Sequence, residues 1–340
     1  MDSSWYVLSL ILINVALWIA LSLIPRFKYR DKVFIVLSFV SLWIFLSIRE
    51  PYSDMIGYTH YFQSIDTSNF GAVLENRWEV LFKVLLFGIR LITDDPQAML
   101  SIVAFITLMG PFLFFKRYSR NYLLSIVMFI ALGSFYMEFY IVRQAIALSV
   151  FLIVFHFISE KKLLKYCLGI IIAALFHKTA LILLIMYPLV NVPPSKYKNI
   201  AIAVISILVI IFSTQITGAL MSDFYSEYID KVTFGNGVSL FLLYVFMYIV
   251  YALVRRKLKT TEEDAVIKAS WLSIFLQFFA IQNNAFCRLA NYTRDSFCVL
   301  IPNSIQKLRS KDRMLFSIII VIACVCFVMG VGLIKGYNIL

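Results

Sequence analysis

The sequence predicts an all-α polytopic integral membrane protein, and three observations support this fold class. The chain has 340 residues, of which 61% are hydrophobic and 15% are charged, whereas a soluble globular protein is about 45–50% apolar and about 25% charged. The mean hydropathy is +0.87. Long apolar runs alternate with short polar loops along the whole chain. No soluble domain can be separated, so residues 1–340 are expected to form a single transmembrane domain.

About twelve apolar segments are expected to cross the membrane, because a span needs roughly 20 apolar residues, and fewer if it is tilted. In chain order they are 5–24, 33–48, 98–115, 121–137, 141–159, 163–177, 179–191, 199–213, 239–254, 266–282, 286–303 and 314–334. A further apolar segment, 78–92, is short and carries Glu79, Lys83 and Arg90. The sequence predicts that it forms a re-entrant or interfacial helix and does not cross.

The distribution of basic residues predicts the orientation of the chain. Six short loops hold 21 of the 31 lysines and arginines, and positive charge collects in cytoplasmic loops. These loops are Arg26–Lys32, Lys116–Arg120, Lys161–Lys165, Lys196–Lys198, Arg255–Lys268 and Lys307–Arg313. If all six are cytoplasmic, both termini and the polar stretches 49–97 and 214–238 lie on the outer face. That face then holds most of the residues able to perform chemistry.

The composition also disfavours several function classes. The net charge of +12 would suggest nucleic acid in a soluble protein, but membrane topology explains it here, and no nucleic-acid partner is expected. The five cysteines lie in or beside apolar segments and have neither metal-ligand nor disulfide-framework spacing. Residues 5–24 follow no basic n-region and precede no cleavage site, so they are expected to be a retained span. The sequence shows no P-loop, zincin helix or nucleophile elbow.

The stretch from Arg49 to Glu79 is the first long polar interruption, and it is expected to form one wall of an active site on the outer face. Polar residues kept near a bilayer are usually functional. Asp54 and Glu50 are candidate proton acceptors, and Arg49 and Arg77 are candidate phosphate ligands. Three tyrosines could stack on sugar rings or, alternatively, form an interfacial aromatic belt: Tyr52, Tyr58 and Tyr61.

Arg143 and His177 interrupt apolar segments at the ends expected to face outward. An arginine at mid-span costs about 2.5–3.5 kcal/mol on insertion scales, and less near the interface. Arg143 either holds a phosphate in a bidentate fork or extends to lipid headgroups. His177 lies between two apolar stretches that are expected to form a hairpin. It either handles a proton or contacts a phosphate near Arg143, or it forms a structural turn.

A second outward cluster surrounds Arg288. Arg288 and Tyr292 are four residues apart, so they share a helix face. Arg288 and Arg294 lie within seven residues of each other, which is costly at the end of a span unless an anion or a carboxylate meets them. The cluster either binds a phosphate or is a structural group formed by Arg294, Asp295 and lipid headgroups.

Five short motifs in this order resemble the EpsG family of membrane proteins, which is related to the Wzy-type O-antigen and capsule polymerases. The motifs are Arg49 with Asp54 and Gly57-Tyr58, Glu79 with Phe82, Arg143-Gln144 with Ile146-Ala147, Phe176-His177 with Thr179-Ala180, and Arg288 with Tyr292. Asp54 stands before Gly57, which departs from the local order of the family pattern. The resemblance covers about residues 35–300.

The resemblance implies a glycosyltransferase of a bacterial cytoplasmic membrane. It would move a glycan from an undecaprenyl-pyrophosphate carrier onto another carrier-linked repeat unit at the outer leaflet. Its implied partners are the carrier-linked oligosaccharide, membrane lipids, a chain-length regulator and a flippase, and neither a cofactor nor a metal is expected. Two other classes stay open: a lipid-linked oligosaccharide flippase or transporter, and a non-catalytic component of a polysaccharide assembly complex.

Within this reaction, the candidate residues take three roles. A sugar hydroxyl is a poor nucleophile at neutral pH, so a base should help by roughly 10²–10⁴-fold, and a single displacement would invert the anomeric carbon. Asp54 is the first choice of base and His177 the second, with Arg143 also catalytic. The expected pyrophosphate ligands are Arg49, Arg77, Arg143 and Arg288. The expected contacts to the acceptor sugar are Tyr52, Tyr58, Tyr61, Glu79 and Tyr292.

Overall fold

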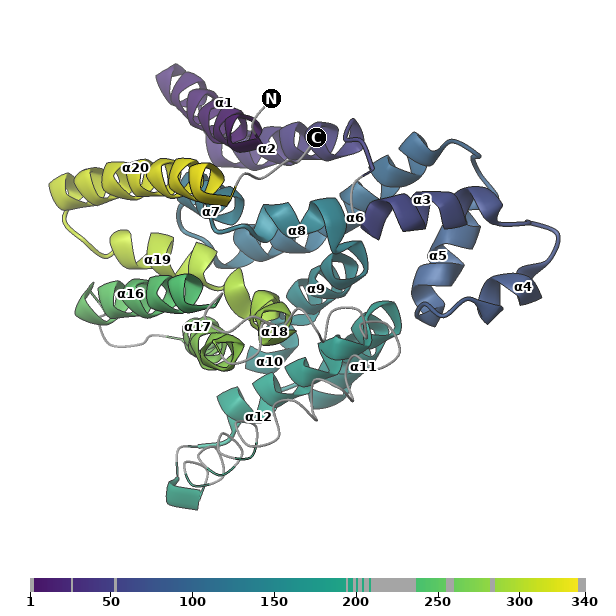
Figure 1. Cartoon of the computed structure of the whole chain (residues 1–340). Coiled ribbons are helices and arrows are strands. Elements are labelled where there is room, and N and C mark those ends of the chain that lie inside the picture. The colour runs from purple at the N-terminus through teal and green to yellow at the C-terminus, as the bar shows by residue number, and fades with distance from the viewer. Residues whose placement is uncertain are drawn as a thin grey trace.

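The computed structural model describes residues 3–25, 27–51, 54–193, 195–197, 200, 204, 208, 237–254, 260–281 and 285–335. Within these ranges every regular element is helical and no strand occurs (Figure 1). The helices are α1 (Ser3–Leu23), α2 (Arg30–Ser47), α3 (Asp54–Ser64), α4 (Phe70–Glu75), α5 (Val80–Arg90), α6 (Pro96–Tyr118), α7 (Tyr122–Ala131), α8 (Ser134–Tyr140), α9 (Val142–Val154), α10 (His156–Ser159), α11 (Leu163–Phe176), the 3₁₀ helix η1 (Lys178–Ile185), α12 (Met186–Asn191), α16 (Val238–Val254), α17 (Thr261–Ala280), α18 (Ala285–Arg294), α19 (Phe297–Ile305) and α20 (Ser310–Lys335). For the residues described, the prediction of an all-helical fold is confirmed.

Length and composition identify which helices could cross a bilayer. Among the described residues, three helical stretches are both long and apolar enough: Pro96–Tyr118, Val142–Ser159 and Ser310–Met329. Five shorter apolar helices accompany them: Val7–Leu23, Tyr122–Ala131, Leu163–Phe176, Lys178–Asn191 and Val238–Val254. These helices support a membrane protein. The count of twelve spans stays a prediction, and its segment 199–213 lies almost wholly outside the described residues, as does most of the predicted outer loop 214–238.

Several predicted spans are divided rather than continuous. Segment 121–137 breaks at Gly133, whose φ of +81° lies in the left-handed region that glycine adopts readily. Segment 141–159 is divided between α9 and α10, and segment 286–303 between α18 and α19. Segment 179–191 begins as the 3₁₀ helix η1. Breaks of this kind are tolerated within a membrane where the surrounding protein satisfies the freed backbone groups.

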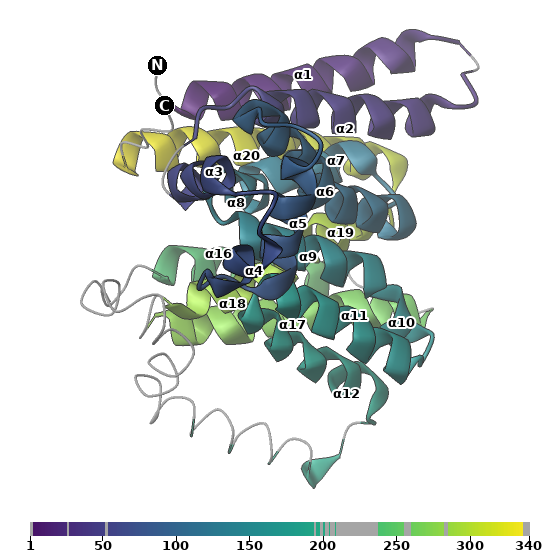
Figure 2. The ribbon, with the colours of Figure 1, turned by 90° about the vertical axis from the view of Figure 1, so that its right-hand side faces the viewer.

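The stretch 49–97 contains three short helices. Helix α5 corresponds to the helix predicted over 78–92, whereas α3 and α4 lie in the part that was expected to be a polar loop. The three helices group at one end of the molecule, beside α6, α9 and α11 (Figures 1 and 2). This group has its own core, in which Phe62, Phe82 and Leu86 are buried with Val103 and Ile146. Helix α5 has 11 residues, about 16 Å at 1.5 Å per residue, which is roughly half the hydrocarbon thickness of a bilayer. The membrane insertion of α5 stays a prediction.

Helices α6 and α9 make a close crossing that carries the site described below. The Ser149 hydroxyl of α9 accepts a hydrogen bond from the Gly110 backbone N–H at 2.9 Å and donates to the Ile106 carbonyl at 2.7 Å. Ser149 therefore bridges a donor and an acceptor that an ideal helix would pair directly. Insertion of a side chain into this ladder is a common cause of helix bending, and Pro111 in α6 adds to it.

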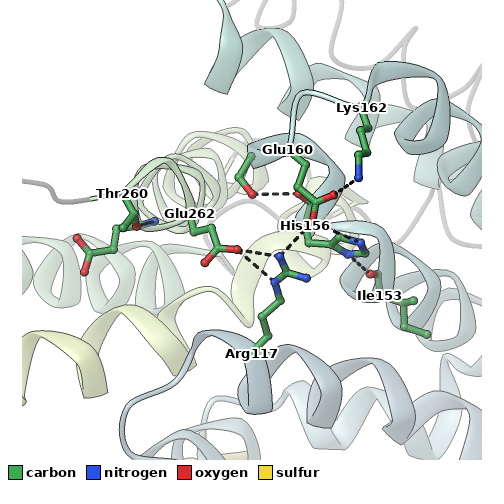
Figure 3. A network of polar contacts seen from close by, with 9 residues as sticks. Arg117, Ile153, His156, Glu160, Lys162, Thr260 and Glu262 are labelled. Atoms are coloured by element: carbon green, nitrogen blue, oxygen red, sulfur yellow. Dashed lines mark hydrogen bonds and ion pairs between the residues drawn. The ribbon is translucent and has the colours of Figure 1, made fainter.

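At the far ends of α6 and α9, the basic loops meet in a polar network (Figure 3). The guanidinium of Arg117 contacts Glu262 at 2.9 Å and Glu160 at 3.2 Å, and Lys162 contacts Glu160 at 2.8 Å. Nδ1 of His156 lies 2.9 Å from the Ile153 carbonyl, and its Nε2 lies 4.0 Å from the Glu160 carboxylate. A cavity of about 200 Å³ lies beside the network and contains none of the predicted site residues. The network joins three of the six loops that the sequence predicts to be cytoplasmic.

Candidate active site

The carboxylate of Glu79 is the centre of a buried polar cluster. One of its oxygens lies 2.5 Å from Nη1 of Arg143. The other lies 3.3 Å from Nδ1 of His177 and accepts a hydrogen bond from the Lys178 backbone N–H at 3.3 Å. The side chains of Glu79, Arg143 and His177 are only 12%, 7% and 7% exposed. We call these three residues the Glu79 cluster.

The local backbone presents each member of the Glu79 cluster at the end of a helix. Glu79 is the N-cap of α5, with extended backbone, and its side chain does not cap its own helix. Arg143 lies in the first turn of α9. His177 has extended backbone where α11 stops and η1 starts. Helices from three distant parts of the sequence therefore converge on one carboxylate, because α5 packs on α11 and α11 packs on α9.

An aromatic group covers one side of the Glu79 cluster. Nε of Arg143 donates to the Tyr58 hydroxyl at 3.0 Å. The guanidinium of Arg143 also lies over the rings of Tyr58 and Trp78, at 5.7 and 5.9 Å from their centroids, a distance at which cation–π attraction operates. Tyr61 packs on Trp78 at 4.8 Å, and its hydroxyl donates to the Val73 carbonyl at 3.0 Å.

The electrostatic surroundings make Glu79 an anchor rather than a base. Burial alone raises the pKa of this carboxyl, but the hydrogen bond from His177 and the charge of Arg143 outweigh burial and lower the pKa to about 2. A group with so low a pKa is ionised at neutral pH and takes up a proton poorly. A carboxylate at Nδ1 of a histidine favours the Nδ1–H tautomer, which leaves Nε2 to accept a proton. The geometry therefore favours His177 as the base.

Arg49 lies in a different environment from Arg143. The residue is buried at 7% exposure, yet none of its three guanidinium nitrogens has a hydrogen-bond partner among the described residues. It lies over the Phe139 ring at 5.6 Å. Burial lowers its pKa to about 10, against the opposing effect of Glu138. A buried guanidinium without an acceptor is costly, so this position is suited to receive an anion.

The remaining family motifs meet on the other side of α9. The Gln144 side chain donates to the Arg288 carbonyl, and the hydroxyls of Tyr292 and Thr179 lie 3.0 Å apart. Helix α18 thereby joins α9 and η1. Next along α18, Arg294 donates to the Gly133 carbonyl at 2.9 Å and to the Ser134 hydroxyl at 3.0 Å, which gives Arg294 a structural role.

The structure does not bring every predicted site residue to the Glu79 cluster. Asp54, the first choice of base, begins α3 and is half-buried, and its side chain makes no hydrogen bond or ion pair with any residue of the described ranges. Arg77 is exposed. Tyr52 lies outside the described residues. The roles assigned to these three residues stay predictions.

The sequence reasoning assigned no role to Trp78, Gln144 or Lys83, which the structure places within or beside the site. Trp78 directly precedes Glu79, and Gln144 directly follows Arg143, so adjacency to a charged candidate was the available signal. Within the described part of the chain, no group of three or more His, Cys, Asp or Glu residues could hold a metal ion. The predicted independence from metals stays a prediction.

The comparisons with known proteins agree with the resemblance noted in the sequence. The model of the EpsG family matches residues 32–338, which include all five motifs. No curated protein matches, and no solved structure matches. A match over this length includes most of α2, the described helices from α3 to α20 and all the residues of the Glu79 cluster. The chain therefore belongs to the EpsG family.

Proposed function

We propose that this protein is a polysaccharide polymerase, which transfers a glycan from an undecaprenyl-pyrophosphate carrier onto another carrier-linked repeat unit. Family membership associates the chain with polymerase-like work in membrane polysaccharide biosynthesis. The proposed reaction is supported chiefly by the buried carboxylate of Glu79, which contacts both the guanidinium of Arg143 and the imidazole of His177. A glycosyl transfer with a pyrophosphate leaving group needs a base for the acceptor and cations for the leaving group.

In the proposed reaction, His177 accepts the proton of the acceptor sugar hydroxyl at Nε2. The hydroxyl oxygen then forms a bond with the anomeric carbon of the donor glycan as the bond from that carbon to the pyrophosphate oxygen breaks. The carrier pyrophosphate leaves with the bonding electron pair. Glu79 holds the imidazole in place and stabilises the imidazolium that forms, as an aspartate does beside a catalytic histidine.

Arg49, Arg143 and Arg288 have different roles in anion binding in this proposal. Arg143 already donates to Glu79 and Tyr58, so much of its hydrogen-bonding capacity is used within the protein. Arg49 has three nitrogens without an acceptor in the described ranges, which supports it as the principal pyrophosphate ligand. A guanidinium binds phosphate oxygens in a bidentate fork that an ammonium cannot reproduce. Arg288, beside Tyr292 on α18, would complete the anion site.

A direct test uses the purified protein in lipid vesicles with a defined carrier-linked repeat unit. Longer carrier-linked glycans are expected from the wild type. The H177Q variant should lose roughly 10²–10⁴-fold in elongation rate and still bind the carrier-linked unit, while H156Q serves as the matched control at the opposite end of α9. Movement of the unit across the vesicle without elongation would assign a flippase instead. If the protein neither elongates the glycan nor moves the unit across the vesicle, it would be assigned as a non-catalytic component.

A further inference from the structure

Lys83 is a buried lysine on the helix that begins at Glu79. The residue is only 4% exposed. Its ammonium donates to the Leu74 carbonyl at 2.6 Å and to the Asn76 carbonyl at 2.8 Å. Among the described residues, no carboxylate lies within ion-pair distance of this ammonium. A buried ammonium that donates hydrogen bonds to two backbone carbonyls fixes the turn to which those carbonyls belong.

The position of Lys83 makes this choice of partners informative. Glu79 and Lys83 are four residues apart, with the glutamate first, which is the favourable arrangement for a local ion pair on a helix. The structure does not form this pair. The Glu79 carboxylate instead faces Arg143 and His177, while the ammonium is directed to the preceding turn. Each group is thus kept from neutralising the other.

The turn held by Lys83 leads directly to Glu79. The Trp78 backbone N–H donates to the Asn76 side chain at 3.0 Å, and the Lys83 backbone N–H donates to the Glu79 carbonyl at 3.2 Å. The Trp78 ring packs on Tyr58 at 4.8 Å. Together with the two bonds of the Lys83 ammonium, these contacts hold the segment at Leu74, Asn76, Trp78 and Glu79. The buried ammonium is the charged group among them.

We propose that Lys83 is a positioning residue, which ties the turn before α5 so that the Glu79 carboxylate reaches Arg143 and His177 together. The expected effect on turnover rests on the proposed function, but the effect on the Glu79 cluster does not. K83M removes the ammonium at nearly constant side-chain length. R90M is the matched control, because Arg90 is the cation at the other end of α5, paired with Asp94 at 2.5 Å.

The first measurement tests whether Lys83 positions Glu79 beside His177, and it needs no substrate. The chain has three histidines, so the imidazole ¹⁵N signals of the purified protein can be assigned by substitution and titrated. E79Q should change the titration midpoint of His177. K83M should change it in the same direction and should speed hydrogen exchange over residues 74–79, while R90M should do neither. An unchanged His177 titration and unchanged exchange in K83M would overturn the proposal. If K83M does not fold, K83Q is titrated in its place, with the same criterion.

The second measurement uses elongation of the carrier-linked unit. A displacement of about 1 Å at a reacting group can cost roughly 10²-fold in rate, so K83M should lower kcat by about 10- to 100-fold with little change in KM. If Lys83 acts through Glu79, K83M should add nothing further to the rate loss of E79Q. A full additional loss in the E79Q K83M double variant would overturn the proposal. Absence of elongation in the wild type would instead refute the proposed function and leave the first measurement decisive.

Discussion

Arg49 and Arg143 are buried to nearly the same extent, at 7% and 6% exposure, but only Arg143 has acceptors within the described protein. A lysine keeps the charge and loses the fork. Because a hydrogen bond to a charged group contributes about 1.5–3 kcal/mol, R49K should weaken binding of the carrier-linked unit by roughly 10- to 100-fold without lowering the unfolding temperature. R143K should lower that temperature, since Glu79 and Tyr58 lose a partner. Equal effects on binding and on unfolding for both variants would contradict this distinction.

The ionisation of Glu79 predicts a pH dependence of stability. Its pKa in the folded protein is lowered to about 2, below the value of about 4.3 in an unfolded chain. The ionised carboxylate therefore contributes stability that is complete above about pH 5 and is lost as the pH falls towards 2. At pH 7, E79Q should be less stable by roughly 3 kcal/mol. The difference from wild type, measured by denaturant unfolding in detergent, should shrink between pH 5 and pH 2. A difference that does not vary with pH would show that Glu79 is not held in this way.

At the residue scale, the sequence identified candidates better than their roles. Glu79, Arg143 and His177 stood out because a charged or polar side chain in an apolar chain is costly. Their meeting could not be predicted, since Glu79 lies 64 residues from Arg143 and 98 from His177, and only the packing of α5, α9 and α11 joins them. Glu79 was expected to contact the acceptor sugar, which stays a prediction, and the structure shows that it contacts two other candidates for catalysis.

At the scale of helices, the close crossing of α6 and α9 predicts which glycine cannot be substituted without destabilising the fold. A Cβ at Gly110 would lie 2.4 Å from the backbone of Ser149, so the two helices would have to move apart. G110A should therefore destabilise the protein by about 1–3 kcal/mol or more. Gly88 in α5 is the matched control, because a Cβ there would have no neighbour within 4 Å. G88A should stabilise by about 0.5–1 kcal/mol, since glycine is unfavourable inside a helix. Equal thermal shifts for the two variants would contradict the close crossing.

Hydropathy predicted the apolar helices well, because a helix that crosses a bilayer needs a long run of apolar residues. The polar residues His177 and Lys178 predicted the break between α11 and η1. Breaks such as Gly133, or the turn at Phe155 between α9 and α10, were not predicted, because they leave the average hydropathy of the run unchanged. Hydropathy predicted a helix at α5 but missed α3 and α4 in the stretch 49–97. Each of these helices is short and buries only one face, as Tyr58 and Phe62 do on α3, so the stretch is polar on average while being folded.

For the whole molecule, two polar clusters lie near opposite ends of helix α6, and the predicted topology would place them on opposite sides of the membrane. Helix α6 has 23 residues, about 34 Å at 1.5 Å per residue, which is close to the thickness of the hydrocarbon core of a bilayer. Its first residues lie beside the link that carries Arg49, where Gln97 donates to the Arg49 carbonyl at 3.3 Å. Its last turn carries Arg117 and the network with Glu160 and Glu262. The candidate site and the basic loops therefore lie at opposite ends of the same helix.

This separation gives the last prediction, which concerns orientation. Ser64 at the end of α3 and Ser310 at the start of α20 are both exposed, and the sequence predicts that they face opposite sides of the membrane. In a background without the five native cysteines, S64C should react with an impermeant thiol reagent added to intact cells, and S310C should react only after the cells are opened. S222C, in the predicted outer loop beyond the described residues, should behave like S64C. Labelling of S310C in intact cells would reverse the orientation and would place the Glu79 cluster on the side of the membrane opposite to the one proposed for polymerisation.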